Sequence, residues 1–228
     1  IELNSMEIPV IPPINISGKT LHRSGSFRLS VSPCHGGHAP ELDNKDLMRQ
    51  LGRLIGRIHL LGEKNSFNHR DHLYDDYYGI EAAQYIIKQA FIPSELKVVY
   101  QQITKELLGK VERAISEAGK TKEIRLHGDF HCGNVLVNKD QLHIVDLDDC
   151  RIGPAIQDIW MFLSGNADEQ EPQLNNLLDG YTEFKEFNSR ELLLIEALRS
   201  LRIIYYSGWL SRRWEDPAFK IAFPWFNT

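Results

Sequence analysis

His127-Gly128-Asp129-Phe130-His131-Cys132-Gly133-Asn134 is the stretch around which this sequence is organised. After it come a β-branched segment at residues 135–137, turn residues at 138–141 and a second apolar segment at 142–145. Alternating short apolar segments joined by turn residues predict a β-hairpin. Asp146 follows the second strand directly. Because a short hairpin brings its two ends together, we expect Asp129, Asn134 and Asp146 to converge on one point.

These three side chains offer two carboxylates and one amide. Hard oxygen ligands of this kind suit a magnesium ion that keeps several waters and is completed by substrate phosphates. The sequence therefore predicts a phosphoryl-transfer site. In it Asp129 orients the attacking hydroxyl and accepts its proton, Asn134 and Asp146 hold Mg²⁺, and Asp146 also bridges the phosphates.

Other polar residues near this site are expected to play supporting roles. His127 and His131 should buttress the loop by hydrogen bonds, and Cys132 should fill space inside it. Asp148 and Asp149 should cap the loop or lie at the surface, although one of them could assist with metal. A loop aspartate such as Asp129 can also simply cap its own backbone, and this remains the alternative to a catalytic role.

The motif His-Gly-Asp-x-His-x-x-Asn, followed by Val-Asp-Leu-Asp-Asp, resembles the catalytic and metal-binding loops of the protein-kinase-like superfamily, in its aminoglycoside and choline kinase branch. More narrowly, residues 126–165 are similar to the bacterial stress response kinase A family. The resemblance implies an α+β, protein-kinase-like fold, ATP as co-substrate, Mg²⁺ as cofactor, and Ser or Thr of a protein as acceptor. It also implies that Asp158 receives the backbone amides of the catalytic loop.

The same resemblance predicts a division of the chain. Residues 1–33 would be the last strands of a truncated small ATP-binding lobe, and residues 34–228 the helical catalytic lobe with the catalytic hairpin at 124–149. The Gly-rich loop, strand lysine and helix glutamate of a kinase are not identifiable, so we expect the chain to begin after them. Asp146-Leu147-Asp148 replaces Asp-Phe-Gly and no Ala-Pro-Glu occurs, which argues against activation-loop control.

Composition narrows the function further. A net charge of −5 argues against non-specific binding of nucleic acid. No apolar run reaches the ~18 residues that a membrane span needs. Three cysteines without Cys-x-x-Cys spacing favour a reducing compartment. We therefore expect a soluble, cytoplasmic monomer that binds neither nucleic acid nor membrane.

Apolar periodicity predicts the remaining elements. Gly52 and Gly56 lie four residues apart in a predicted helix, which indicates a neighbouring helix in very close contact, and His59 at the edge of that helix should be a hydrogen-bonded structural residue. Asn188 and Glu191 resemble a capping box at the start of another helix. Extended segments are expected at 7–11, 19–22 and 26–31 with a turn at 24–26, and helices at 43–62, 81–90, 93–119, 153–165, within 171–187, and over a core segment at 192–206.

Two other functions stay open. The first is a small-molecule kinase acting on an aminoglycoside, choline or a homoserine-like amino alcohol, for which Asp71, Asp75 and Asp76 would supply an acidic acceptor pocket. The second is a non-catalytic nucleotide-binding module. The presence of Asp129 and Asp146 together with Asn134 counts against this module, because a protein without catalysis has no chemical need for all three.

Overall fold

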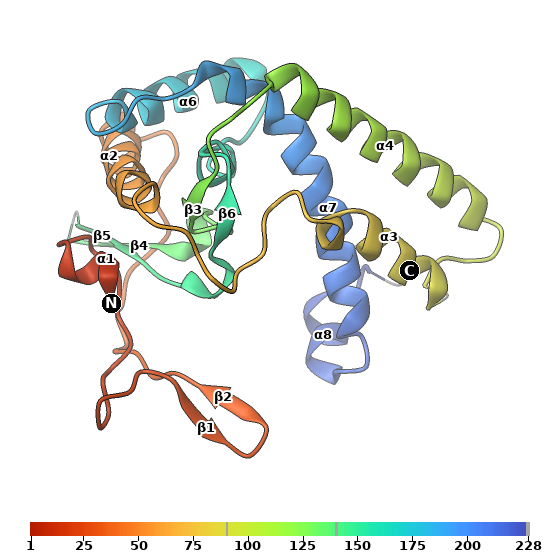
Figure 1. Cartoon of the computed structure of the whole chain (residues 1–228), viewed down its shortest axis with the longest axis horizontal. Helices are drawn as coiled ribbons and strands as arrows, with labels where there is room; N and C mark the ends of the chain where they lie inside the picture. Colours follow the sequence, from red (N-terminus) through yellow and green to blue (C-terminus); the bar gives the residue numbers. More distant parts are fainter. Residues whose placement is uncertain (90, 140, 227–228) are drawn as a thin grey trace. The chain divides into compact units, whose positions relative to one another are not determined.

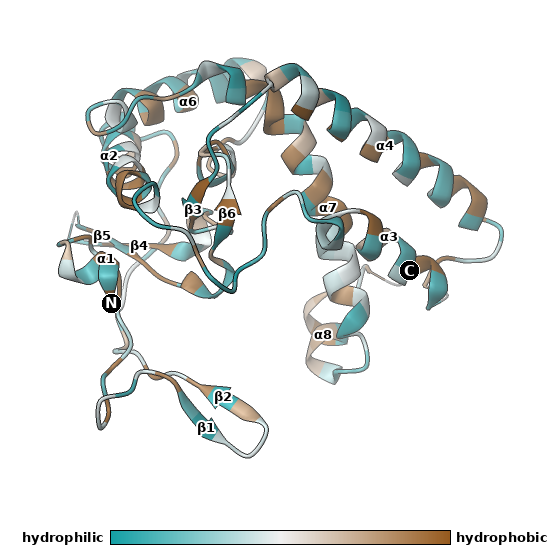
Figure 2. Ribbon diagram, viewed as in Figure 1, coloured by the Kyte–Doolittle hydropathy of each residue, from teal (hydrophilic) through white to brown (hydrophobic). Residues whose placement is uncertain are grey.

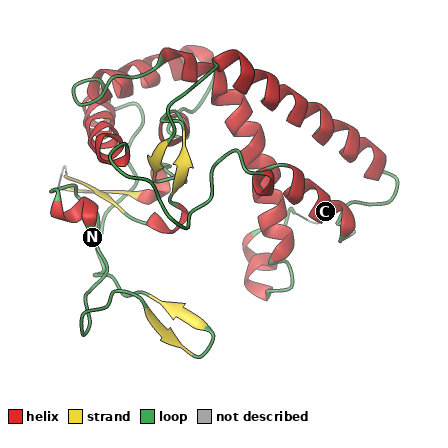
Figure 3. Ribbon diagram, in the orientation of Figure 1, coloured by secondary structure: helices red, strands yellow, loops and turns green. Residues whose placement is uncertain are grey.

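The computed structural model of the chain describes residues 1–89, 91–139 and 141–226 (Figure 1). Contacts group these residues into two units, one made of residues 1–70 and 123–187, the other of residues 71–122 and 188–228. Helices dominate after Asp43, and the named strands of the described chain pair only as two-stranded antiparallel ribbons (Figure 3). This agrees with the expected α+β class. The division into lobes at 1–33 and 34–228 stays a prediction.

The first unit contains the predicted site. Two helices, three ribbons and several short helical turns build it. Its elements are α1 (Glu2–Ser5), β1 (His22–Ser24), β2 (Phe27–Leu29), α2 (Lys45–Gly62), β3 (Ile124–Leu126), the 3-10 turn η2 (Cys132–Asn134), β4 (Val135–Asn138), β5 (Gln141–Ile144), the 3-10 turn η3 (Leu147–Asp149), β6 (Arg151–Gly153), α5 (Gln157–Trp160) and α6 (Ala167–Tyr181).

Helices α2 and α6 pack so closely that glycine is required at the contact. A Cβ built on Gly52 would overlap the carbonyl oxygen of Leu177, and one on Gly56 would lie 2.7 Å from the carbonyl oxygen of Tyr181. On the other helix, a Cβ on Gly180 would overlap the carbonyl oxygen of Arg49. The predicted close approach is confirmed. The cap of α2 is one residue later than expected, because Asn44 and not Asp43 accepts the Leu47 amide.

The catalytic hairpin is confirmed with a tighter turn than expected. Strands β4 and β5 pair from Val135 with Ile144 to Asn138 with Gln141. The predicted four-residue turn at 138–141 was therefore too long, since its outer residues belong to the ladder. Lys139 takes a positive φ of 48° in the turn, and Asp140 lies outside the described residues. Strands β3 and β6 form a second ribbon that brackets the loop and the hairpin.

Several predicted bounds in this unit were wrong. Residues 2–5, where no helix was expected, form a helical turn. The extended segment expected at 7–11 contributes only an isolated bridge of Val10 with Ile144, whereas the ribbon of β1 and β2 with its turn at Gly25 is confirmed. The helix expected over 153–165 shrinks to the single turn α5, because Arg151–Gly153 pairs with β3. Helix α6 begins earlier than expected, at a capping box formed by Asn166 and Glu169.

The second unit is helical. It contains the 3-10 turn η1 (Asp76–Tyr78), α3 (Ile80–Lys88), α4 (Lys97–Ala118), the 3-10 segment η4 (Ser189–Leu194), α7 (Ile195–Arg212) and α8 (Pro217–Ala222). Asn188 caps η4 by accepting the Arg190 amide, so the expected capping box with Glu191 is not formed. The segment of α7 is apolar nearly all round and was expected to be central in the core, but Ile203 is 62% exposed.

Helix α4 begins at Lys97, after a turn at the predicted start. Its apolar positions are buried only toward the C-terminal end, where Val111 joins a cluster with Ala197 and Leu201 of α7. Figure 2 shows apolar and polar residues alternating along its surface. No described helix combines the length and apolarity that a membrane crossing would require.

Candidate active site

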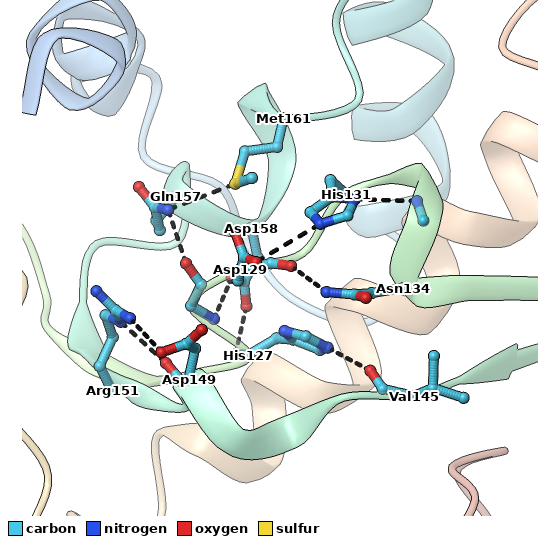
Figure 4. Close-up of polar contacts among 12 residues, drawn as sticks. His127, Asp129, His131, Asn134, Val145, Asp149, Arg151, Gln157, Asp158 and Met161 are labelled. Atoms are coloured by element: carbon cyan, nitrogen blue, oxygen red, sulfur yellow. Dashed lines mark hydrogen bonds and ion pairs between the residues drawn. The ribbon is translucent and has the colours of Figure 1, made fainter. Parts of the chain in front are cut away.

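The loop that carries Asp129 connects β3 to η2, and its backbone is hydrogen-bonded to the side chain of Asp158 of α5 (Figure 4). One carboxylate oxygen of Asp158 accepts the backbone N–H of His127 at 2.7 Å, and the other accepts that of Gly128 at 2.8 Å. The side chain of Asp158 is fully buried. The expected role of Asp158, as acceptor of the loop amides, is thus seen directly in its contacts.

His59 of α2 completes this support. Its Nε2 donates to Asp158 at 3.1 Å, and its Nδ1 lies 3.2 Å from the hydroxyl of Tyr181. His59 is fully buried and hydrogen-bonded at both ring nitrogens, as expected of a structural histidine. Burial by itself would raise the pKa of Asp158, but the hydrogen bond from His59, the electrostatic effect of His59 and His127, and the Gly128 amide together hold that pKa below its ordinary value.

Asp129 is fixed at the peptide groups on both of its sides. The side-chain amide of Gln157 donates to the carbonyl oxygen of Gly128 at 2.9 Å. The side-chain amide of Asn134 donates to the carbonyl oxygen of Asp129 itself at 2.8 Å. The carboxylate of Asp129 is half-buried and lies 3.5 Å from His131 Nε2. The loop therefore holds Asp129 rigidly while leaving its carboxylate partly accessible.

The hairpin register sets Asp146 beside Asn134. The amide of Val145 donates to the carbonyl oxygen of Asn134 at 3.1 Å, so the next residue, Asp146, leaves the hairpin next to Asn134. Asp146 is exposed and adopts a left-handed backbone conformation with φ of 59°. Positive φ at a non-glycine residue is uncommon and concentrates at functional sites. The predicted proximity of the hairpin ends is confirmed.

His127 and His131 buttress the loop as predicted. His127 Nε2 donates to the carbonyl oxygen of Val145 at 2.9 Å, which ties the loop to the residue before Asp146. Its ring stacks on Phe130 with centroids 4.6 Å apart. His131 Nδ1 accepts the Gly133 amide at 3.0 Å. Both histidines thus shape the backbone that presents Asp129.

Gly128 sits where no other residue fits. Its φ is +87°, and an added Cβ would overlap the carbonyl oxygen of Asp149 and lie 2.8 Å from Arg151 Nε. Arg151 is buried, and its Nε donates to that same carbonyl oxygen at 2.9 Å. Its Nη2 pairs with the carboxylate of Asp149, an exposed residue, at 3.2 Å. Asp148 is exposed, and its carbonyl oxygen accepts a hydrogen bond from Arg70.

Sequence reasoning missed Gln157 and Arg151. Both lie in the segment that follows the hairpin, where only the neighbouring Asp158 drew attention. In the described residues, no group of three His, Cys, Asp or Glu side chains could hold a metal ion. The expected magnesium set is of another kind, since it combines the amide oxygen of Asn134 with the carboxylate of Asp146.

The remaining candidates have ordinary environments. Cys34, Cys132 and Cys150 are all free thiols. Burial raises the pKa of Cys132, which fits a space-filling role. Burial also raises the pKa of Cys150 to about 12. Asp75 caps its own loop by accepting the His72 amide at 2.8 Å.

Comparison with known proteins identifies the family. Residues 3–193 match the phosphotransferase enzyme family. Stress response kinase A of Escherichia coli strain K12 is 43% identical over 227 residues, covering 100% of this chain and 68% of that protein. A Salmonella typhimurium relative named serine/threonine protein kinase RdoA is 42% identical over 229 residues, with the same two coverages.

Solved structures show the fold. Amicoumacin kinase hAmiN, in complex with AMP-PNP, Ca²⁺ and Ami, superposes with a TM-score of 0.71 at 22% identity, covering 99% of this chain and 72% of that one. Spectinomycin phosphotransferase APH(9)-Ia in its AMP complex gives 0.64 at 17% identity, with coverages of 98% and 76%. The expected protein-kinase-like fold is confirmed. By sequence and by fold, this chain belongs to the phosphotransferase enzyme family and, within it, to the stress response kinase A family.

Proposed function

We propose that this phosphotransferase is an ATP- and Mg²⁺-dependent protein kinase that phosphorylates Ser or Thr. Asp129 is its catalytic residue, and Asn134 and Asp146 are its metal ligands. The observation that carries the proposal is the hydrogen bond from Asn134 to the Asp129 carbonyl oxygen, because it joins the two predicted roles in one rigid loop. The name of the Salmonella typhimurium relative, serine/threonine protein kinase RdoA, favours a protein acceptor.

Asp129 acts on the acceptor hydroxyl. Its half-buried carboxylate is held by fixed peptide groups, so it orients the hydroxyl oxygen toward the γ-phosphorus. As the bond from that oxygen to phosphorus forms, the bond from phosphorus to the β,γ-bridging oxygen breaks, ADP leaves, and Asp129 accepts the hydroxyl proton. Phosphoryl transfer passes through a loose transition state with little covalent assistance from the protein. Positioning of the hydroxyl is therefore the main contribution of Asp129.

Asn134 and Asp146 fit a hard cation. The Asn134 amide nitrogen is occupied by the Asp129 carbonyl, which leaves Oδ1 as the atom available to a ligand. Asp146 follows Val145, whose amide donates to the Asn134 carbonyl oxygen, and as an exposed residue it offers a carboxylate to the same cation. Carboxylate and amide oxygens are preferred by Mg²⁺, which when bound neutralises charge on the phosphates. The AMP-PNP and Ca²⁺ bound in the amicoumacin kinase complex support a nucleotide-metal site of this type.

The test uses the full-length protein with γ-labelled ATP, MgCl₂ and dephosphorylated casein as acceptor. Asp146→Asn keeps the shape of the side chain but removes its charge, so we expect phosphate transfer to fall at least ~100-fold. Asp129→Asn should reduce the turnover number similarly while the Kd for ATP changes less. The matched control is Asp179→Asn, the same substitution at an exposed position of α6, which should leave transfer unchanged.

The same assay separates the alternatives. Full activity of Asp146→Asn would refute the assignment of the metal ligand. Transfer to kanamycin, choline or homoserine, with none to casein, would identify a small-molecule kinase that uses the same residues. Nucleotide binding without transfer to any of these acceptors or to water would identify a non-catalytic module.

A further inference from the structure

We infer that Gln157 is a positioning residue of the phosphotransfer site, which fixes the peptide group immediately before Asp129. The inference rests on the proposed role of Asp129. Gln157 is almost completely buried in α5, and its Nε2 donates to the carbonyl oxygen of Gly128 at 2.9 Å (Figure 4). A buried side-chain amide directed at a loop carbonyl restrains that loop, because loss of the contact would leave a buried polar group unsatisfied.

The orientation of the Gln157 amide is determined by Trp160. The indole Nε1 of Trp160 donates to Gln157 Oε1 at 3.1 Å. An indole nitrogen can only donate, so the amide oxygen must face Trp160. The NH₂ group then faces Gly128. One turn of α5 thus supplies both Gln157, which donates to the loop carbonyl, and Trp160, which fixes the orientation of the Gln157 amide.

The contacts around Asp129 form a series along the backbone. Asp158 holds the N–H groups of His127 and Gly128, and so the two peptide groups that precede Gly128. Asn134 holds the carbonyl of Asp129, and so the peptide group that follows it. The planar peptide group between Gly128 and Asp129 is the one left, and Gln157 holds it through the Gly128 carbonyl.

The peptide group between Gly128 and Asp129 is less restrained by local sterics than its neighbours. Gly128 has φ of +87° and no Cβ, so rotation about its bonds is opposed by less steric hindrance than at any other residue type. Such a rotation would turn the Cα–Cβ bond of Asp129 and move its carboxylate. Misplacement of a reacting group by about 1 Å can cost on the order of 100-fold in rate. Gln157 therefore acts on the turnover number through Asp129 without touching the substrate.

The test compares variants of the full-length protein by ADP release and by phosphate transfer to casein. Gln157→Met keeps the length of the side chain without its donor, and we expect kcat to fall about tenfold or more with little change in the KM for ATP. Gln157→Glu retains the Trp160 contact but places a carboxylate oxygen against the Gly128 carbonyl, so its kcat should fall further. Trp160→Phe should have a smaller effect, and none when added to Gln157→Met.

A control separates positioning from loss of stability. Leu201→Ala opens a cavity in the buried cluster that Leu201 of α7 forms with Val111 of α4, and it should lower the melting temperature without lowering kcat. Hydrogen exchange of the Asp129 and Phe130 amides should accelerate in Gln157→Met and stay unchanged in Leu201→Ala. If kcat and exchange in Gln157→Met match those of wild type while Asp129→Asn is inactive, the role of Gln157 is refuted and the proposed function stands. If Asp129→Asn is active, the proposed function itself is refuted.

Discussion

A hydrogen bond of 3.1 Å joins Asp158 Oδ2 to His59 Nε2, and neither side chain has any exposed surface. The same carboxylate accepts two backbone amides of the catalytic loop, so the pair transmits the rigidity of α2 to that loop. Asp158→Asn would direct an NH₂ group at one of the three donors. We expect it to lower the free energy of unfolding by about 3 kcal/mol, since it breaks a buried charged network.

Urea unfolding followed by circular dichroism measures this loss. Asp179→Asn on the exposed side of α6 is the matched control and should change the free energy by no more than about 0.5 kcal/mol. Equal stability of the two variants would contradict the supporting role of Asp158.

The low pKa of Asp158 makes stability depend on pH with a definite sign. A carboxyl group whose pKa is lower in the folded than in the unfolded state binds fewer protons when folded. Its stabilising contribution is complete above its ordinary pKa and is lost as the pH falls through the folded value. Unfolding free energies measured from pH 7 downward should therefore decrease more steeply for wild type than for Asp158→Asn below about pH 4. Parallel curves would contradict this.

Two Gly→Ala substitutions, one at the contact of α2 with α6 and one in α4, should change the stability in opposite directions. Gly52→Ala would overlap the Leu177 carbonyl oxygen, and because that atom belongs to a helix backbone it cannot move aside cheaply. We expect a loss of about 2–3 kcal/mol of stability. Gly109→Ala in α4 meets open space and should stabilise by up to ~1 kcal/mol. Denaturant titration measures the free energy of unfolding of both variants. A Gly52→Ala variant as stable as wild type would show that the two helices lie farther apart.

Substitutions at Gly128 and Gly25 distinguish the cost of a strained backbone from the cost of a steric clash. Both have positive φ, but only Gly128 has neighbours that an added Cβ would meet. Gly25→Ala should cost about 1–2 kcal/mol of stability and leave activity intact. Gly128→Ala should displace Asp129 and reduce phosphate transfer on the order of 100-fold. Melting temperature and transfer to casein, measured for both variants, test this pair, and similar activities would contradict it.

The cysteines should react in an order set by exposure and pKa. With a pKa of about 12, Cys150 is thiolate in only about one part in ten thousand at pH 8. Cys34 is exposed, so iodoacetamide should label it first in the native protein, and Cys150 only after unfolding in urea. Peptide mass spectrometry reads out the sites. Equal native labelling of both would contradict this order.

The sequence was informative where structure is local. The hairpin that brings Asn134 and Asp146 together depends on a short turn between two β-branched segments, and both signals lie within a few residues. The paired glycines of α2 correctly indicated a close helix. Nothing in that pattern named Gly180 as its counterpart, because the match between two distant helices depends on their packing.

Longer-range contacts account for the errors. Gly153 and the following proline look like a helix start, yet Gly153 pairs with Ile124 in a ribbon that only the tertiary fold creates. Gln157 gave no signal because a polar residue in an apolar stretch does not reveal what it faces. Helix α7 has apolar residues on every side, and the local pattern could not show that Ile203 would remain exposed.

The first unit is built from two segments that are separated in sequence by residues 71–122. His59 therefore leaves the ribosome long before its partners, since Asp158 follows it by 99 residues and Tyr181 by 122. At about 5–20 residues per second, the nascent α2 waits roughly 6–24 s for the helix that covers its glycines. During that interval its apolar face has no native partner. Binding of a chaperone to this segment during synthesis is the expected biological consequence of a discontinuous unit.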